Sequence, residues 1–360
     1  MRFQHYNDLI ENGGTDKIRK KREAILFLFS EVLTAVDPYK AVARYCKDNT
    51  LLLNDTIINI KDFKNIYIVA FGKGSIGMTQ AICDHLPVLK GIAITNQTGT
   101  MVSHKDVEII VGGHPIPNEQ SVLSAEKVKT LLSTCQTDDL VIILISGGGS
   151  ALLASPRVSL SDLQYTTKAL LYSGATIQEI NTIRKHLSTV KGGQLVNKLP
   201  CRVVSYIISD VVGDPIEFIS SGPTIGDSTT FSDAYHALQK YDLWNKVPIS
   251  VQRVIIDGKN GLIPETPFPN DHVFSRVSNV IIANNSMACQ TAFDKAKLLG
   301  YNPVILYTDL TGEARNLGPQ LYKKAKRCYE ETGANLFISG GEPTVTITGD
   351  GSGGRNQELA

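Results

Sequence analysis

The stretch DLVIILISGGGSALL, residues 139–153, decides the fold. Its first seven residues are almost continuously apolar, as expected for a strand of a parallel sheet whose two faces are both covered by helices. A turn of three glycines between two serines follows this strand. Short apolar runs that alternate with helical patterns along the chain are typical of α/β proteins. Four more strands of this kind are predicted at residues 65–71, 91–95, 107–111 and 203–209.

Helical spacing fills the segments between these strands. The predicted helices are residues 76–86, 119–133 and 177–190, and the third is closed by Gly192–Gly193. Residues 258–271 are rich in Pro, Gly and Asn and are the best candidate for a linker. Beyond them we predict strands at 278–283, 303–307 and 335–339, and helices at 286–299 and 312–331. We therefore expect an α/β protein with a larger domain at residues 1–265 and a smaller one at 276–360.

Length and composition narrow the class of protein. A chain of 360 residues favours two domains. A formal net charge of +1 predicts no nucleic-acid or acidic-membrane partner, and no apolar run approaches the roughly 20 residues that span a bilayer. The six cysteines are scattered, which indicates reduced thiols and not a zinc site or a disulfide framework. The N-terminal sequence favours the cytoplasm over the mitochondrion. The oligomeric state stays open, with a homodimer as one option.

Small and polar residues follow five of the predicted strands. They are GKGSIGM after residue 71, SGGGSALL after 145, SDVVGDP after 208, NNS after 283 and SGGEPT after 338. In parallel α/β sheets, ligands bind just outside the carboxyl ends of the strands. One such loop could be ordinary turn chemistry, but five in succession favour a built site.

The first loop, GKGSIG, matches the G-x-G-x-x-G pattern of dinucleotide-binding proteins. That pattern also needs an acidic residue about 20 positions later, and none occurs between Asp84 and Asp106. A Walker-type phosphate loop is excluded because Tyr67 stands where its first glycine is required. What remains is Lys73 on a tight turn at a strand end. We interpret it as a functional lysine, the competing interpretation being a solvated surface lysine.

The second loop predicts an anion site. Gly147, Gly148 and Gly149 can present backbone N–H groups, and Ser146 and Ser150 add hydroxyls, so the loop can hold phosphate or an oxyanion without covalent chemistry. The alternative is a tight connection that needs glycine only for its turn.

The helix predicted at residues 177–190 carries a cationic face. Asn181, Arg184 and Lys191 follow each other at spacings of three and seven, which predicts that they lie on one side. A substrate- or phosphate-binding face and a solvated basic face are equally good interpretations. His186 is off this face and is interpreted as structural.

Carboxylates and one arginine complete the candidate site. Asp210 and Asp214 follow a predicted strand and could hold Mg²⁺, and Asp210 could instead orient a hydroxyl proton; an Asx turn or helix cap is the alternative. Glu342 and Arg355 flank the last glycine-rich loop, where an arginine can bind phosphate with its forked donors. These residue types suit phosphoryl transfer, which depends on positioning and charge neutralisation.

Four motifs carry a family resemblance. SGGGSALL, EINTIRKHLSTVKGG, SDVVGDPIEFISSGPT and GGEPTVTITGDGSGGRNQELA, in this order, closely resemble the glycerate 2-kinase family of the MOFRL type, with its animal members nearest. The resemblance implies ATP-dependent, Mg²⁺-assisted phosphorylation of D-glycerate, chiefly to 2-phosphoglycerate. It implies a Rossmann-like parallel-sheet N-terminal domain, a smaller α/β C-terminal domain and an active site in the cleft between them. The family's catalytic lysine and arginine map to Lys73 and Arg355.

The chain departs from the family pattern in three places. Asn118 stands where the HPxPD motif often has an acid, and Gly351-Ser352 replaces a position that is commonly basic. Family members also continue beyond the last helix, so the resemblance implies an incomplete C-terminal domain and, for this chain alone, poor solubility or weak activity. The alternatives to a kinase are an NAD(P)-dependent hydroxypyruvate or tartronate reductase and an inactive truncated fragment.

Overall fold

The computed structural model describes residues 3–346, 348–349 and 351–360, and these form two compact units. Unit 1 combines the residues up to Lys40 with those from Ala283 onward, and unit 2 is Ala41–Ile282. This division differs from the expected domains at 1–265 and 276–360, because helix α2 (Asp16–Ala35) packs against helix α11 (Asn285–Leu298). The N-terminal helix therefore belongs with the C-terminal part of the chain.

A six-stranded sheet forms the centre of unit 2. Its strands, in spatial order, are β6 (Val107–Val111), β5 (Lys90–Thr95), β4 (Ile66–Phe71), β7 (Leu140–Ile145), β8 (Arg202–Ile208) and β9 (Val277–Ala283). The pairings from β6 to β8 are all parallel, which confirms the predicted fold class. Strand β9 was expected to open the second domain, but it lies beside β8 at the edge of this sheet.

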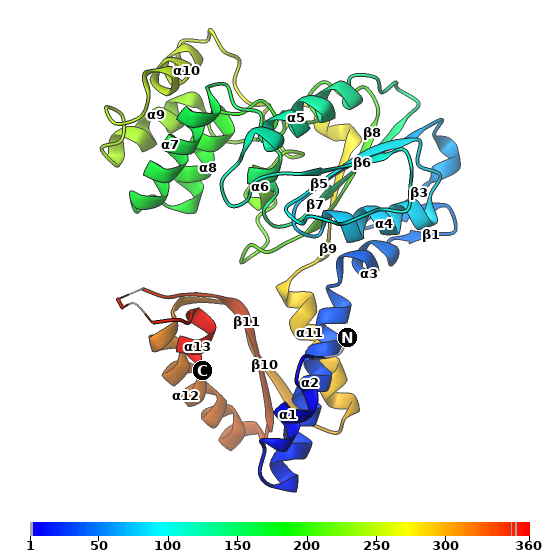
Figure 1. The fold of residues 1–360 in the computed structure, drawn as a ribbon, viewed down its shortest axis with the longest axis vertical. Coiled ribbons are helices and arrows are strands. Elements are labelled where there is room, and N and C mark those ends of the chain that lie inside the picture. Colours follow the sequence, from blue (N-terminus) through cyan, green and yellow to red (C-terminus); the bar gives the residue numbers. More distant parts are fainter. Residues whose placement is uncertain (1–2, 347, 350) are drawn as a thin grey trace. The chain divides into compact units, whose positions relative to one another are not determined.

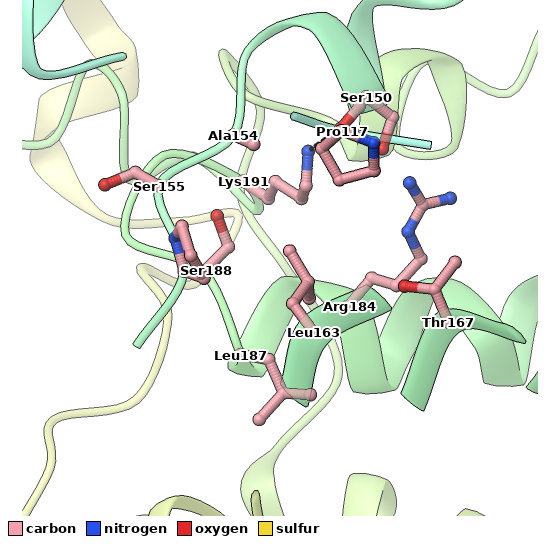
Figure 2. A pocket seen from close by; sticks show the side chains of 11 residues that line it. Pro117, Ser150, Ala154, Ser155, Leu163, Thr167, Arg184, Leu187, Ser188 and Lys191 are labelled. Carbon is pink, nitrogen blue, oxygen red and sulfur yellow. Dashed lines mark hydrogen bonds between the residues drawn. The ribbon is translucent and has the colours of Figure 1, made fainter. Parts of the chain in front are cut away.

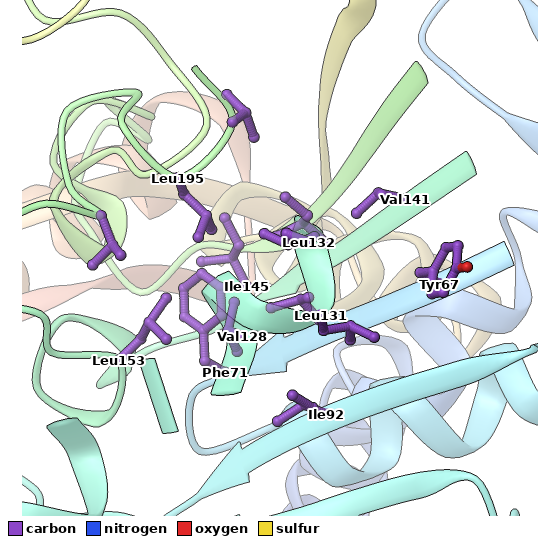
Figure 3. Close-up of a cluster of buried hydrophobic side chains, with 14 of the residues drawn as sticks. Tyr67, Phe71, Ile92, Val128, Leu131, Leu132, Val141, Ile145, Leu153 and Leu195 are labelled. Atoms are coloured by element: carbon purple, nitrogen blue, oxygen red, sulfur yellow. The ribbon is translucent and has the colours of Figure 1, made fainter. Parts of the chain in front are cut away.

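Helices cover both faces of the sheet. In Figure 1, α4 (Ser75–His85) lies on one side of the strands and α5 (Glu119–Leu132) on the other. Alternate residues of the central strands point toward α5, so that Phe71 and Ile145 pack near Val128 in the main core (Figure 3). Because both faces are covered, every residue of β4 and β7 is buried. This explains why the predicted positions of the five strands from β4 to β8 agree with the structure to within one residue.

Four helices form a separate layer of unit 2 around their own apolar cluster: α7 (Leu160–Tyr172), α8 (Ile177–His186), α9 (Phe231–Lys240) and α10 (Ile249–Lys259). Helix α8 ends at His186, so the prediction that it reaches residue 190 is wrong. Leu187 and Val190 continue the apolar spacing, but Ser188 forms an isolated bridge with Pro156 instead of another helical turn. Lys191 consequently lies outside the helix.

Residues 258–271, the expected linker, are part of unit 2. Thr266 is 2% exposed, and its hydroxyl donates to Asp227 Oδ2 at 3.0 Å. The Glu265 carboxylate accepts from the backbone N–H of Phe231 at 3.1 Å and pairs with His186 at 3.2 Å. The Pro- and Gly-rich composition therefore marks a packed loop and not a flexible connection.

Unit 1 contains a smaller α/β arrangement. Strand β10 (Pro303–Glu313) pairs in parallel with β11 (Leu336–Thr344), and α11 and α12 (Ala314–Thr332) pack against them. The remaining short elements are α1 (Tyr6–Glu11), α3 (Pro38–Ala43), β1 (Cys46–Lys47), β2 (Thr50–Leu52), β3 (Ile57–Asn59), α6 (Gly149–Leu152), α13 (Arg355–Leu359) and three 3-10 turns, η1 (Ile60–Asp62), η2 (Ile219–Ser221) and η3 (His272–Arg276). All six cysteines are free. Across the described residues, none of the helices combines the length and the apolar character that crossing a bilayer requires.

Candidate active site

The glycine loop between β7 and α6 is closely surrounded by side chains. A Cβ atom on Gly147 would lie 2.0 Å from Asp210 Oδ2, and one on Gly149 would lie 2.4 Å from Ser220 Oγ. Gly148 adopts a φ of 85°, which favours glycine for its backbone as well. Within the described part of the chain, the N–H groups of Gly147 and Gly148 have no hydrogen-bond partner. The loop therefore has the free donors that the predicted anion site needs.

The Lys73 turn is joined to this loop by two hydrogen bonds. The backbone N–H of Lys73 donates to the carbonyl of Gly147 at 2.9 Å, and that of Gly74 donates to Ser146 Oγ at 3.0 Å. The turns after β4 and β7 are adjacent because the two strands pair in parallel, with Phe71 beside Ile145. Lys73 is exposed, and its Cε would lie 3.5 Å from a Cβ on Gly148. Its ammonium is thus available above the loop.

The two predicted carboxylates follow β8. Asp210 is exposed and lies over Gly147, whereas Asp214 is half-buried and has a positive φ of 55°. Among the residues that the structure describes, no group of three or more His, Cys, Asp and Glu side chains is arranged to hold a metal. A magnesium ion here would therefore rely on one or two carboxylates together with substrate oxygens, which is a common arrangement for Mg²⁺.

His114 joins the site although sequence reasoning did not select it. It follows β6 in a cis His114–Pro115 step, and its Cδ2 would lie 2.8 Å from a Cβ on Gly148. Burial lowers the pKa of His114, the nearby Lys73 ammonium lowers it further, and Asp210 opposes both. The available signal was the motif HPIPN directly after a strand. The imidazole is therefore held neutral beside the glycine loop at neutral pH.

Two basic side chains, Arg184 and Lys191, line a small cavity behind the loop (Figure 2). Arg184 and Lys191 extend from different segments toward Ser150, and Lys191 Nζ donates to the Ser150 carbonyl at 2.7 Å. Burial lowers the pKa of Lys191 well below its usual range, and the Arg184 charge adds to this. Arg184 has no carboxylate partner within the described residues. Helical spacing was expected to bring Arg184 and Lys191 together, and this is wrong because Lys191 lies beyond α8. The tertiary fold brings the two side chains together instead.

Asn181 does not line this pocket and instead contacts the turn η2. Ser221 Oγ donates to Asn181 Oδ1 at 2.7 Å, and Ser221 is also 2.9 Å from Ser150 Oγ. Ser220, Ser221 and Gly222 all have positive φ values, of 52°, 62° and 60°. The backbone N–H groups of Gly192 and Gly193 hold this turn by donating to the carbonyls of Ser221 and Gly222, at 3.0 and 2.8 Å. Such backbone strain often accompanies functional sites.

Arg355 and Glu342 belong to unit 1 and contact each other. Arg355 NH1 lies 2.9 Å from Glu342 Oε1, and both side chains are about half exposed. An exposed pair of this kind contributes about 0–1 kcal/mol, so the arginine can exchange its partner for a phosphate at little cost. In the glycine-rich loop before Arg355, Ile347 and Asp350 lie outside the described residues.

Comparisons with known proteins agree with this arrangement. A family described as "Domain of unknown function (DUF4147)" matches residues 24–256. The chain is 42% identical to the glycerate 2-kinase of Pyrococcus horikoshii, covering 94% of this chain and 78% of that protein. It is 34% identical to the glycerate kinase of Rattus norvegicus, covering 92% and 74%. A crystal structure of the glycerate kinase of Thermotoga maritima superposes with a TM-score of 0.80 at 34% identity, covering 94% of this chain and 78% of that one.

Proposed function

This chain belongs to the glycerate kinase family, and we propose that it transfers the γ-phosphoryl group of ATP to D-glycerate, giving 2-phosphoglycerate and ADP. One observation carries the proposal. Lys73, the free N–H groups of the glycine loop and Asp210 converge at the carboxyl ends of three neighbouring parallel strands, β4, β7 and β8. This is where α/β sheets bind ligands, and these groups supply what phosphoryl transfer requires.

The residues have distinct roles in the proposed reaction. The C2 hydroxyl oxygen of glycerate forms a bond to the γ-phosphorus while the bond from that phosphorus to the β,γ-bridging oxygen breaks. The exposed carboxylate of Asp210 accepts the hydroxyl proton. Lys73 and the N–H groups of Gly147 and Gly148 neutralise the charge on the transferring phosphoryl oxygens. ADP leaves with the electron pair of the broken bond.

The site also fits a magnesium ion. Asp210 and Asp214, which both follow β8, carry the carboxylate oxygens that Mg²⁺ prefers as ligands. When bound, the ion would reduce the negative charge of the ATP phosphates. Asp214 is then the principal protein ligand, because Asp210 is assigned the proton.

Substrate binding involves the cations outside the loop. We propose that Arg184, whose guanidinium lacks a carboxylate partner among the described residues, binds the glycerate carboxylate beside Ser150. Lys191 holds the loop through the carbonyls of Ser150 and Leu153, at 2.7 and 3.4 Å. Arg355 contributes a phosphate contact when it exchanges Glu342 for a phosphate oxygen. The six free cysteines support a cytoplasmic location.

A coupled assay tests the function. Purified protein is supplied with MgATP and D-glycerate, and ADP release is followed. Enolase then converts 2-phosphoglycerate but not 3-phosphoglycerate, so phosphoenolpyruvate formation reports the position of transfer. ADP release that depends on D-glycerate and is matched by phosphoenolpyruvate is the expected result. Oxidation of NADH by hydroxypyruvate, without ADP release, would instead identify the reductase.

A further inference from the structure

A chain of three polar side chains leads from the glycine loop into the interior. Ser150 Oγ lies 2.9 Å from Ser221 Oγ, and Ser221 Oγ donates to Asn181 Oδ1 at 2.7 Å. Ser221 is 1% exposed and Asn181 is 3% exposed, whereas Ser150 is half-buried and lines the pocket with Arg184 and Lys191. The outer end of this series, Ser150, therefore lies beside Arg184, the residue that the proposed function assigns to the glycerate carboxylate.

The hydrogen bonds in this chain have one possible direction. Asn181 Nδ2 donates to the carbonyl of Ile177 at 3.0 Å, and turning the amide over would place two oxygens against each other. Asn181 Oδ1 therefore faces Ser221 and accepts its single hydroxyl proton. Since Ser221 has no second proton, Ser150 must be the donor in the bond between the two serines. Ser150 Oγ is left with lone pairs only.

We propose that Ser150 Oγ accepts a hydrogen bond from the C3 hydroxyl of D-glycerate, and that Ser221 and Asn181 are positioning residues that fix this polarity. The inference rests on the proposed function. It changes the expected role of Ser150, because carboxylate and phosphate oxygens are acceptors and gain nothing from another acceptor. This series of hydrogen bonds ends at the Asn181 amide, which takes up no proton. Ser150 therefore offers no route for the proton of the reacting C2 hydroxyl. The hydroxyl that it contacts is therefore the one that does not react.

The proposal thus divides recognition of the substrate between two neighbouring residues. Arg184 supplies positive charge for the carboxylate, and Ser150 supplies an acceptor for a neutral hydroxyl. A site built to pair a hydroxyl discriminates against the analogue that lacks it, because its polar group is then left unpaired. D-Lactate lacks the C3 hydroxyl of D-glycerate, and 3-hydroxypropionate lacks the C2 hydroxyl, so the pair tests the assignment.

The test measures binding of the three acids to the full chain by calorimetry, without turnover. The unsubstituted protein is expected to bind D-lactate about tenfold more weakly than D-glycerate. Ser150→Ala is expected to weaken D-glycerate binding about tenfold and to leave D-lactate unchanged, so that the ratio of the two Kd values falls toward one. Its ratio of Kd values between 3-hydroxypropionate and D-glycerate should stay unchanged, because both acids carry the C3 hydroxyl that Ser150 contacts and only D-lactate lacks it.

The positioning residues have their own readout. Asn181→Leu removes the acceptor for Ser221 and should lower the D-lactate to D-glycerate ratio, as should Ser221→Ala. Asn181→Asp keeps an acceptor oxygen and should preserve the ratio, a rescue that a purely structural role does not predict. Ser133→Ala is the matched control, because Ser133 is an exposed serine whose Oγ donates only to the Thr130 carbonyl, at 2.7 Å. Circular dichroism checks that each variant is folded.

Two results would overturn the inference. Equal weakening of all three acids by Ser150→Ala would mean that Ser150 contacts the shared carboxylate. Unchanged binding of 3-hydroxypropionate together with weaker binding of D-lactate would mean that it contacts the C2 hydroxyl. The proposed function fails separately: a protein that shows the expected binding pattern but releases no ADP is not a kinase for this acid. Kinase activity with an unaltered ratio in Ser150→Ala contradicts only the inference.

Discussion

At the scale of single residues, Gly148 combines two requirements that can be separated by experiment. Its φ is 85°, and a Cβ would lie 2.8 Å from the His114 ring. Gly99 has a similar φ of 73° but nothing within 4 Å of its Cβ position. We expect Gly148→Ala and Gly99→Ala to lose similar stability, about 1–2 kcal/mol, from backbone strain. Only Gly148→Ala should lower kcat, by at least about tenfold, since it displaces His114 and Lys73. Equal kcat values in the two variants would contradict this.

Lys73 is expected to affect both catalysis and its neighbour. Lys73→Ala should lower kcat by about 10²–10³-fold while the fold stays intact, because it removes a charge from the transferring phosphoryl group. It should also raise the pKa of His114, since the Lys73 charge is one of the causes that lower it. An NMR titration of the His114 ring measures that pKa, and Lys61→Ala, at an exposed lysine, is the control. An unchanged His114 pKa would show that the two groups do not interact.

At the scale of elements, a buried ion pair holds α8 to the segment that follows η2. Lys185 Nζ lies 3.2 Å from Asp227 Oδ1, and the two side chains are 2% and 0% exposed. Asp227 also accepts from the hydroxyls of Thr229 and Thr266. Lys185→Met leaves this carboxylate buried without its cation, so we expect a loss of about 3–5 kcal/mol in urea denaturation.

The control for this prediction is another lysine pair. Lys240 on α9 lies 2.7 Å from Glu179, but its side chain is 61% exposed. Lys240→Met should therefore lower the free energy of unfolding much less than Lys185→Met does. If the two substitutions cost the same, the Lys185–Asp227 pair is not the structural link that its burial indicates.

The elements show which parts of the fold are visible in the sequence. The five strands from β4 to β8 were predicted almost to the residue, because a strand buried on both faces is an unbroken apolar run. The end of α8 was not, since Leu187 and Val190 continue the helical spacing while Ser188 pairs with Pro156. Residues 258–271 have the composition of a linker, yet Glu265 and Thr266 make buried contacts that only the tertiary structure reveals.

The candidate site also contains residues that could be predicted from the sequence and residues that could not. Lys73, the glycine loop and Asp210 could be predicted, because parallel strands bring their carboxyl ends together by simple geometry. Ser221 could not be assigned a role, since its partners Ser150 and Asn181 lie 71 and 40 residues away in sequence. His114 carried a motif but no charge partner until the fold brought it to Lys73 and Asp210.

At the scale of the whole molecule, the two units bury their sheets to different degrees. All residues of β4 and β7 in unit 2 are buried, whereas Pro343 is the single buried residue of β11 in unit 1. The interior strands can exchange their amide hydrogens only through large-scale unfolding, and exposed strands exchange through local opening. The two sheets should therefore differ in protection although both are hydrogen-bonded.

Hydrogen exchange followed by mass spectrometry tests this difference. Peptides covering β4 and β7 should stay protected for hours, those covering the edge strand β6 should be intermediate, and those covering β11 should exchange within minutes. Each rate is divided by the intrinsic rate of its own sequence, so that composition does not imitate protection. The Lys185→Met variant adds a second comparison, because global destabilisation of unit 2 should speed exchange in β4 and β7 by a common factor and leave β11 unchanged. Slow exchange in β11 would contradict the prediction. It would mean that the exposed residues of β11 are covered in solution and that this burial, and not the hydrogen bonds of the strand alone, protects its amides.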